Sequence, residues 1–183
     1  DLVLINKLAY DLKIPFTTTH IAQWDDPARG DIVVCYSPKD GIRLVKRVIG
    51  LPGDKIELRN EVLIINDVPQ KYSAQDASPY QRDIFEDPNP VVVVEYLKDA
   101  PHLIMILPNR MAVRNFQPYI VPEGNYFMMG DSRDNSTDSR MIGPVLRSEI
   151  IGQATYVLAS FDTARYLLPR FGRFAHSLEF DES

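Results

Sequence analysis

A single lysine inside an apolar strand is the first feature of this sequence that could do chemistry. Successive strand side chains alternate between two faces, so Lys46 shares one face with three apolar residues, Ile42, Leu44 and Val48. An ammonium group held against such a face loses hydration, which lowers its pKa. From an ordinary value of about 10.4, burial lowers a lysine pKa by up to about 3–5 units, enough for a general base. The simpler interpretation is a lysine whose head group reaches water past its apolar neighbours.

The second candidate region is the polar run from Gly130 to Arg140, which directly follows the apolar run Tyr126–Met129. It alternates acidic side chains with arginines. Such a run is often a solvated turn, but it also fits a folded network in which ion pairs and hydroxyls orient a neighbouring group. Residues 135–137 also match a glycosylation sequon, which is a weak pattern.

Other catalytic arrangements find little support. The histidines, His20, His102 and His176, show no metal-ligand spacing, although spacing cannot exclude a Ser-His-Asp triad. The sequence contains no Gly-x-Ser-x-Gly elbow, phosphate loop or dinucleotide fingerprint. The single cysteine, Cys35, excludes an intrachain disulfide and a cysteine-based zinc site, and we expect it to be a small buried residue. We therefore expect no metal and no cofactor.

The amino-acid composition is typical of an ordinary globular protein. The 183 residues are 45% apolar and 25% charged, and the net charge of -5 argues against nucleic acid as a partner. The longest apolar runs, Val91–Val94 and Leu103–Leu107, are much shorter than the roughly 18 residues of a membrane-spanning helix. The chain opens inside an apparent strand, Asp1–Ile5, without an initiating Met, so we expect it to be part of something longer.

The elements that must position these residues are short strands separated by turns. Pro52-Gly53 suits the centre of a type II turn, and residues 67–90 are expected to form an irregular loop. We predict a mostly β fold in which residues 1–66 and 122–183 form the core and residues 67–121 form a smaller inserted β and loop region. The expected strands are Asp31–Tyr36, Ile42–Gly50, Lys55–Leu58, Val62–Ile65, Val91–Leu97, His102–Leu107, Tyr126–Met129 and Gln153–Ser160.

Taken together, these segments resemble the type I signal peptidases, a family of serine endopeptidases that use a Ser/Lys dyad. Residues 29–34, 46–54 and 130–140 each resemble a sequence box of that family, and Ser132 replaces the more frequent Asn in the last box. Residues 1–10 and 156–173 are similar to further family segments, while 67–120 falls in a variable region. The resemblance implies a signal-peptidase-like, β-rich catalytic core.

The resemblance also implies roles for individual residues. Lys46 matches the general base, and Ser136 matches the hydroxyl that positions it. Four residues match a structural ion-pair network of the site, and two match apolar positions that shape shallow pockets for small substrate side chains. The network residues are Asp131, Arg133, Asp138 and Arg140, and the pocket residues are Val34 and Val45.

One departure from the family pattern concerns the nucleophile. The family's serine lies in a Ser-Met-x-Pro box about nine residues before the position that matches Asp1, and the sequence given contains no such box. We therefore expect this stretch alone to be inactive. The resemblance further implies preprotein signal peptides with Ala-x-Ala-like sites as substrates. It also implies N-terminal helices, absent here, that hold the catalytic domain on the outer, periplasmic side of the bacterial cytoplasmic membrane.

Two alternatives stay open at this point. One is a Ser/Lys processing peptidase that cuts itself or one dedicated partner. The other is an inactive homologue that binds extended peptides without cleaving them. A panel of unrelated preproteins separates the first from a general signal peptidase, and the residue at the serine position separates the second.

Overall fold

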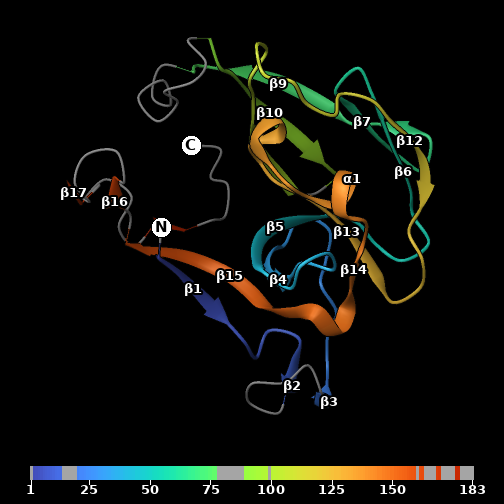
Figure 1. Cartoon of the computed structure of the whole chain (residues 1–183), viewed down its shortest axis with the longest axis vertical. Helices are drawn as coiled ribbons and strands as arrows, with labels where there is room; N and C mark the ends of the chain where they lie inside the picture. The colour runs from blue at the N-terminus through green and yellow to red at the C-terminus, as the bar shows by residue number, and fades with distance from the viewer. Residues whose placement is uncertain are drawn as a thin grey trace.

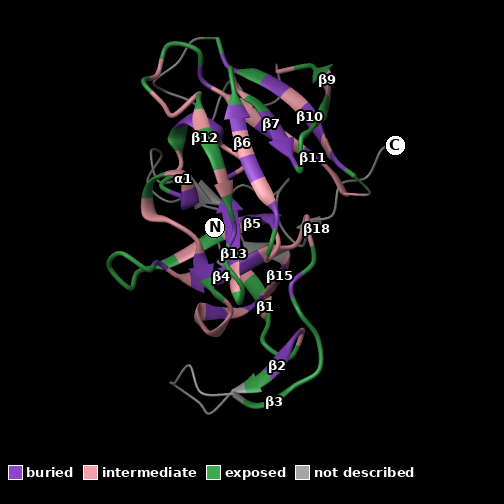
Figure 2. Ribbon diagram, turned by 90° about the vertical axis from the view of Figure 1, so that its right-hand side faces the viewer, coloured by how far each residue is buried: buried purple, intermediate pink, exposed green. Residues whose placement is uncertain are grey.

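The fold is built almost entirely from antiparallel strands. The computed structural model describes residues 2–13, 20–77, 89–98, 100–159, 161–162, 168–169 and 176–177. Its strands form a seven-stranded sheet that carries most of the predicted core, together with four- and three-stranded sheets that lie above it in both views (Figures 1 and 2). The predicted mostly β architecture is therefore confirmed.

The bounds of the elements follow the sheet order. The seven-stranded sheet contains, in spatial order, β1 (Leu2–Asn6), β15 (Ile150–Ala159), β4 (Ile32–Tyr36), β5 (Arg43–Gly50), β13 (Asn125–Met129) and β14 (Val145–Leu146), and β18 (His176–Ser177) pairs with β15. The four-stranded sheet contains β12 (Phe116–Ile120), β6 (Lys55–Arg59), β7 (Val62–Ile65) and β8 (Val68–Pro69). The three-stranded sheet contains β11 (Ala100–Ile106), β10 (Val91–Leu97) and β9 (Lys71–Gln75).

Smaller elements complete the described part. Two short hairpins are β2 (Asp11–Lys13) with β3 (His20–Gln23) and β16 (Phe161–Asp162) with β17 (Leu168–Pro169). The helical turns are α1 (Ser139–Ile142) and the 3-10 segments η2 (Arg133–Asn135) and η3 (Arg147–Glu149). The β2–β3 hairpin projects from the body at the bottom of both views (Figures 1 and 2).

Strand β13 and the second half of β5 are buried on both faces. Along β13, Phe127 and Met129 pack into one apolar cluster, whereas Tyr126 and Met128 pack into a second cluster on the other side. Alternation of side chains along a strand explains this division. The continuous apolar run at residues 126–129 therefore reflects a strand enclosed by protein on both sides.

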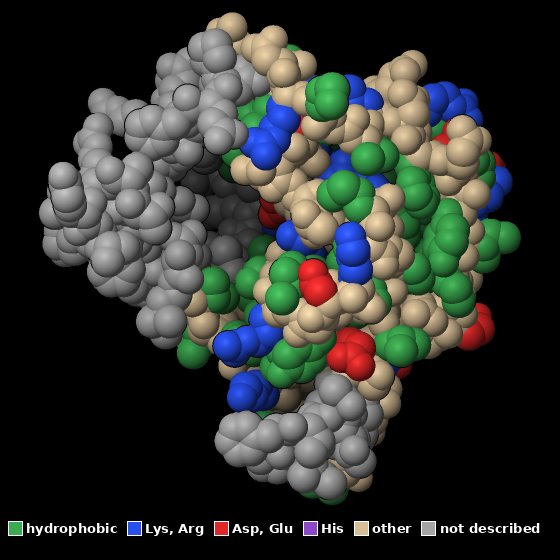
Figure 3. Space-filling view, in the orientation of Figure 1, with side chains coloured by type: hydrophobic (Ala, Val, Ile, Leu, Met, Phe, Trp, Pro, Cys, Tyr) green, Lys and Arg blue, Asp and Glu red, His purple; other side chains and the backbone are tan. Residues whose placement is uncertain are grey.

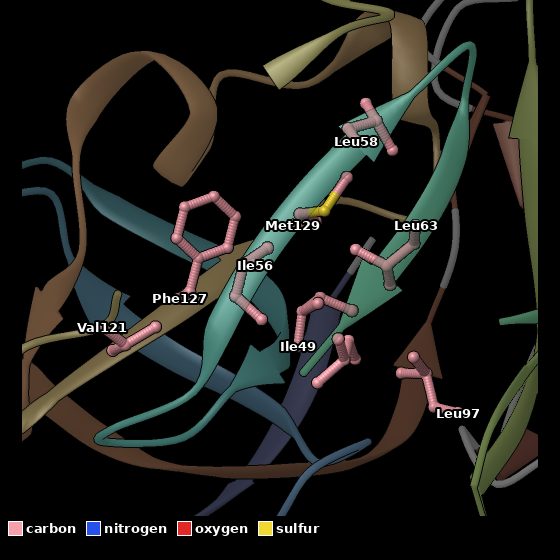
Figure 4. Close-up of a cluster of buried hydrophobic side chains, with 9 residues drawn as sticks. Ile49, Ile56, Leu58, Leu63, Leu97, Val121, Phe127 and Met129 are labelled. Carbon is pink, nitrogen blue, oxygen red and sulfur yellow. The ribbon is translucent and has the colours of Figure 1, made fainter. Parts of the chain in front are cut away.

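The first cluster joins all three sheets. It gathers side chains from β5 and β13, from the β6–β7 hairpin and from the end of β10 (Figure 4), and its buried members are Ile49, Ile56, Leu58, Leu63, Ile65, Leu97, Val121, Phe127 and Met129. The second cluster lies on the opposite face and contains Tyr10, Val33, Cys35, Val48, Tyr126, Met128, Val145 and Ile150. The outer surface over β12 also carries apolar side chains (Figure 3), and Ile120 is 65% exposed there.

Most of the predicted strands are present with small changes in their bounds. Gly53 adopts a φ of +84°, as the predicted type II turn requires. The strand predicted over His102–Leu107 begins earlier than expected, at Ala100, which pairs directly with Leu97. Strand β15 begins earlier than expected, at Ile150. The last residue of that predicted strand, Ser160, lies outside the described residues, as do Asp1 and much of the predicted C-terminal similarity segment.

The prediction of an irregular loop over residues 67–90 was wrong for its first part. Residues Val68–Pro69 and Lys71–Gln75 form β8 and β9, while 78–88 lie outside the described residues. Strand β9 is largely exposed and polar, so its sequence has no apolar alternation. It becomes a strand because its backbone pairs with the buried strand β10.

Residues 67–121, which we predicted to be an insertion, contribute to two sheets. They supply all of the three-stranded sheet, and they also supply β8 and β12 at the two edges of the four-stranded sheet. The inner strands of that second sheet, β6 and β7, come from the preceding part of the chain. The first apolar cluster therefore ties residues 67–121 to β5 and β13.

Replacing Leu63 by Ala should destabilise the fold by about 2–5 kcal/mol, because its fully buried side chain would leave a cavity in the first cluster. Urea unfolding measures this change. The matched control is Val68→Ala in the same sheet, where the side chain is 60% exposed and the expected change is within about 0.5 kcal/mol. Equal losses in the two variants would contradict this assignment of the core.

Candidate active site

The candidate site is centred on a glycine that two of the predicted site residues approach. A methyl group added to the Cα of Gly130 would lie 2.2 Å from Ser136 Oγ and 3.6 Å from Lys46 Nζ. The hydroxyl and the amine are therefore separated by no more than the sum of those two distances. Two residues ninety positions apart in the sequence thus meet over a position that has no side chain.

Strand pairing places Lys46 at this point. Lys46 lies opposite Val33 in the β4–β5 register, and Leu44 lies opposite Cys35, so these four side chains share one face. Val33 and Cys35 are fully buried members of the second apolar cluster, and Lys46 itself is half-buried. Ile42, which we placed on the same stripe, precedes β5 and is exposed.

The pKa of the neighbouring Cys35 thiol reflects the apolar character of this face. Burial raises the pKa of Cys35 to about 12, and the charge of nearby Lys46 opposes that increase only in part. Cys35 Sγ lies 3.6 Å from Met128 Sδ on β13. The alkyl part of Lys46 therefore lies on a strand face that is closely packed on either side of it.

Ser136 is placed by the turn that follows β13. The carboxylate of Asp138 accepts a hydrogen bond from the Gly130 N–H at 3.0 Å, which closes the turn from Gly130 to Asp138. Asp138 also caps α1 by accepting a hydrogen bond from the Arg140 N–H. Ser136 Oγ is buried, and the nearby Ser136 side chain helps to lower the pKa of Asp138. The closed turn carries this hydroxyl to the position beside Gly130.

Arg140 holds Asp138 in place. Its Nε and Nη2 atoms donate to the two carboxylate oxygens of Asp138 at 2.8 Å each, so the pair is bidentate. Burial acts to raise the pKa of Asp138, but the guanidinium group and the Gly130 N–H outweigh it and lower that pKa. Asp138 is accordingly a buried carboxylate that favours its charged form.

Asp131 and Arg133 pair with other residues. Arg47, next to Lys46 but on the opposite face of β5, donates to both carboxylate oxygens of Asp131 at 2.9 and 2.7 Å. It also donates to the carbonyl of Gly30 at 2.8 Å. Arg133 pairs with Glu95 on β10. Each of the four predicted network residues thus takes part in an ion pair in this structure.

Val34 and Val45 lie directly opposite one another in the β4–β5 register. Alternation places them on the face opposite Lys46. Val34 is buried, whereas Val45 is 46% exposed, so the two side chains form a step with an accessible apolar edge. Strand pairing therefore brings these two residues together, but on the other face from the site at Gly130.

Sequence reasoning missed three features of this site. Gly130 lies in a segment that resembles a family box. The sequence did not reveal that a side chain at position 130 would block the approach of Ser136 to Lys46. The partners Arg47 and Glu95 were also missed. A signal existed for Arg47, because it neighbours Lys46 in a recognised box, whereas nothing in the local sequence marked Glu95.

Comparisons with known proteins place the chain in a family. Residues 1–159 match the family described as signal peptidase, peptidase S26. The chain belongs to this family. It is 33% identical to signal peptidase I of Pseudomonas aeruginosa over 189 residues, which cover 94% of this chain and 64% of that protein. It is 40% identical to signal peptidase I of Rickettsia typhi over 140 residues, covering 72% of this chain and 52% of that protein.

The chain spans less than two thirds of the length of these curated relatives. Among solved structures, it is similar to a signal peptidase I from Enterococcus faecalis at 32% identity and a TM-score of 0.43, covering 70% of this chain and 97% of that one. No helix in the described part of the chain has the length and apolar character to cross a membrane. Within the same residues, no group of three or more His, Cys, Asp or Glu side chains could hold a metal ion.

Replacing Gly130 by Ala should destabilise the protein by about 1–3 kcal/mol, because the new methyl group would overlap Ser136. The same substitution should cost much less when Ser136 is already Gly, since both overlapping atoms belong to the Ser136 side chain. A double-mutant cycle by urea unfolding measures this coupling. Equal costs in the two backgrounds would show that the two residues do not touch.

The lowered pKa of Asp138 predicts a pH dependence. Between the ordinary aspartate pKa of about 3.9 and the lower folded-state value, the unfolded chain binds more protons than the folded chain. Asp138 therefore contributes stability above about pH 4 that is lost as the pH falls towards its folded pKa. The stability difference between the wild type and Asp138→Asn should shrink when urea unfolding is repeated from pH 7 down to pH 3. A constant difference would be inconsistent with this assignment.

Proposed function

We propose that the complete protein is a membrane-bound signal peptidase that removes signal peptides from exported preproteins after an Ala-x-Ala-like site. The observation that carries this proposal is the meeting of Lys46 Nζ and Ser136 Oγ over Gly130. Membership of the signal peptidase family supports it. The similarity to signal peptidase I of Pseudomonas aeruginosa and of Rickettsia typhi supports it as well.

In the proposed mechanism, Lys46 is the general base. A lysine can take a proton from a serine hydroxyl only as the free amine, and an apolar surrounding favours that form. The packed face formed by Val33, Leu44 and Cys35 supports this role, because it limits the hydration of the lysine side chain. Ser136 orients the amine by offering its buried hydroxyl as a hydrogen-bond partner.

The proposed nucleophile is a serine in a segment that precedes Asp1, as in the family pattern. Its hydroxyl attacks the scissile carbonyl while Lys46 takes the proton. The amine of the departing mature chain then receives that proton, and water hydrolyses the resulting ester between the serine and the signal peptide. In this scheme the four ion-paired residues hold the backbone around Gly130 and do not react.

We propose that the substrate binds as an extended strand beside the sheet. Added main-chain hydrogen bonds would supply affinity, and apolar side chains would supply specificity. The apolar step formed by buried Val34 and accessible Val45 lies on the face of β4 and β5 opposite Lys46, and it supports a shallow binding surface for small side chains on that face. A larger substrate side chain would be rejected there by steric overlap.

The proposed location is the outer face of the bacterial cytoplasmic membrane. N-terminal helices in the complete protein would hold the catalytic domain beside emerging preproteins. The length of the curated relatives, of which this chain spans less than two thirds, is consistent with such additional segments. The net charge of -5 argues against nucleic acid as a partner.

In the full-length protein, Lys46→Ala should abolish cleavage of a preprotein, because no other group would accept the serine proton. Ser136→Ala should lower the rate without abolishing it, since this residue orients the base, and it should alter the pH–rate profile. The matched control is Lys55→Ala, which removes an exposed lysine of β6 that pairs with Asp67. Gel analysis of product formation from pH 6 to pH 10 measures these effects.

Near-normal cleavage by the Lys46→Ala variant would remove Lys46 from the mechanism. Several unrelated preproteins should be used as substrates, because cleavage of one alone would indicate a dedicated processing peptidase. Binding of extended peptides without cleavage by any wild-type sample would indicate a peptide-binding homologue.

A further inference from the structure

A buried ion pair connects the three-stranded sheet to the turn that carries Ser136. Glu95 of β10 is fully buried, and its Oε1 accepts a hydrogen bond from Arg133 Nη1 at 2.9 Å. Arg133 Nη2 donates to the other carboxylate oxygen. Tyr72 of β9 donates its hydroxyl to Oε1 at 2.7 Å, and His102 Nε2 of β11 lies 3.3 Å from Oε2. All three strands of the small sheet therefore converge on the residue that binds Arg133.

A continuous set of contacts leads from this pair to the candidate site. Arg140 Nη2 donates to the backbone carbonyl of Arg133 at 2.6 Å. The same arginine holds Asp138 through its bidentate ion pair. Asp138 in turn accepts the hydrogen bond of the Gly130 N–H. Glu95 thus lies four linked contacts from the glycine over which Lys46 and Ser136 meet.

The small sheet also holds the same turn through its backbone. Met105 of β11 donates its N–H to the carbonyl of Asp131 at 2.9 Å, and the Leu107 N–H donates to Asp134 Oδ2 at 2.8 Å. These two contacts hold residues that precede and follow Arg133 in the sequence. The segment that precedes Ser136 is therefore positioned by β11 and by the side chain of Glu95.

We propose that Glu95 is a positioning residue for peptide-bond cleavage, a role that rests on the function proposed above. It acts through Arg133 and Arg140 to hold the turn that sets Ser136 beside Lys46. It does not itself contact substrate, because its side chain has no exposed surface. The three-stranded sheet is accordingly a working part of the catalytic apparatus.

The chemistry of the pair favours a geometric role. Burial opposes ionisation of Glu95, but Arg133 outweighs that effect, so the pKa of Glu95 lies below its usual range. Buried ion pairs contribute little net stability, because desolvation consumes most of the attraction, but they fix orientation closely. The planar guanidinium group of Arg133 fits the carboxylate in one bidentate arrangement. Such a pair determines where the backbone of residue 133 lies.

The test compares Glu95→Gln with Glu57→Gln in the full-length protein inserted in its membrane. Glu57 pairs with Arg59 on β6 and takes no part in the described contacts that lead to Gly130, so its variant should retain the wild-type kcat. Glu95→Gln preserves the side-chain shape and should lower kcat about tenfold or more with KM nearly unchanged, because small displacements of reacting groups cost large factors in rate. An unchanged kcat for Glu95→Gln would overturn the proposal.

A second variant separates positioning from stability. Glu95→Gln combined with Arg133→Met removes the charged pair, and replacement of a buried pair by neutral groups is often tolerated by the fold. The expected result is a wild-type melting temperature with the same loss of kcat. Loss of kcat that follows the fraction of unfolded protein, or full activity in this variant, would overturn the proposal.

Hydrogen exchange supplies a readout that does not depend on cleavage. In Glu95→Gln, exchange of the Gly130 amide should accelerate, because its partner Asp138 is held through Arg140 and Arg133, while exchange in β6 and β7 should stay unchanged. Unchanged exchange at Gly130, or equal acceleration throughout the protein, would overturn the proposal. If wild-type protein cleaves no preprotein, the proposed function fails, and the exchange data still decide whether Glu95 positions the turn.

Discussion

The site depends on one steric constraint, the absence of a side chain at Gly130. Ser136 and Lys46 come from distant parts of the chain. The Ser136 side chain occupies the space that a side chain at position 130 would fill, and Lys46 Nζ lies at contact distance from that space. The sheet register brings Lys46 to this point, and the Asp138 carboxylate fixes the Gly130 backbone from the other side. The proposed general base and the hydroxyl proposed to orient it become neighbours because residue 130 has no side chain.

Rigidity around this contact comes from two sources that differ in kind. Apolar clusters on both faces of β5 and β13 resist displacement of the strands. Charged pairs then fix the turn, through Arg47 with Asp131, Arg140 with Asp138 and Arg133 with Glu95. Burial of apolar side chains stabilises the fold. The bidentate ion pairs contribute little net free energy, but their specific geometry fixes the orientation of the turn.

The sequence predicted the features that local patterns encode. Alternation and turn residues gave the strands β4 to β7 and the Pro52-Gly53 turn, and the family resemblance pointed to Lys46 and Ser136 before any geometry was known. Strand β9 was missed because its backbone pairing with β10, and not its side chains, makes it a strand. The partner of Arg133 was missed because Glu95 lies 38 residues away in a variable region, and pairing between distant side chains leaves no periodic signal.

The alternating burial of β13 has a consequence for how this chain can change over time. Phe127 and Met129 face one cluster, and Tyr126 and Met128 face the other. A single inserted or deleted codon between Tyr126 and Gly130 would exchange the two sets and rotate the bare backbone position away from Ser136. Length variation should therefore be excluded from residues Tyr126–Met129 of this strand.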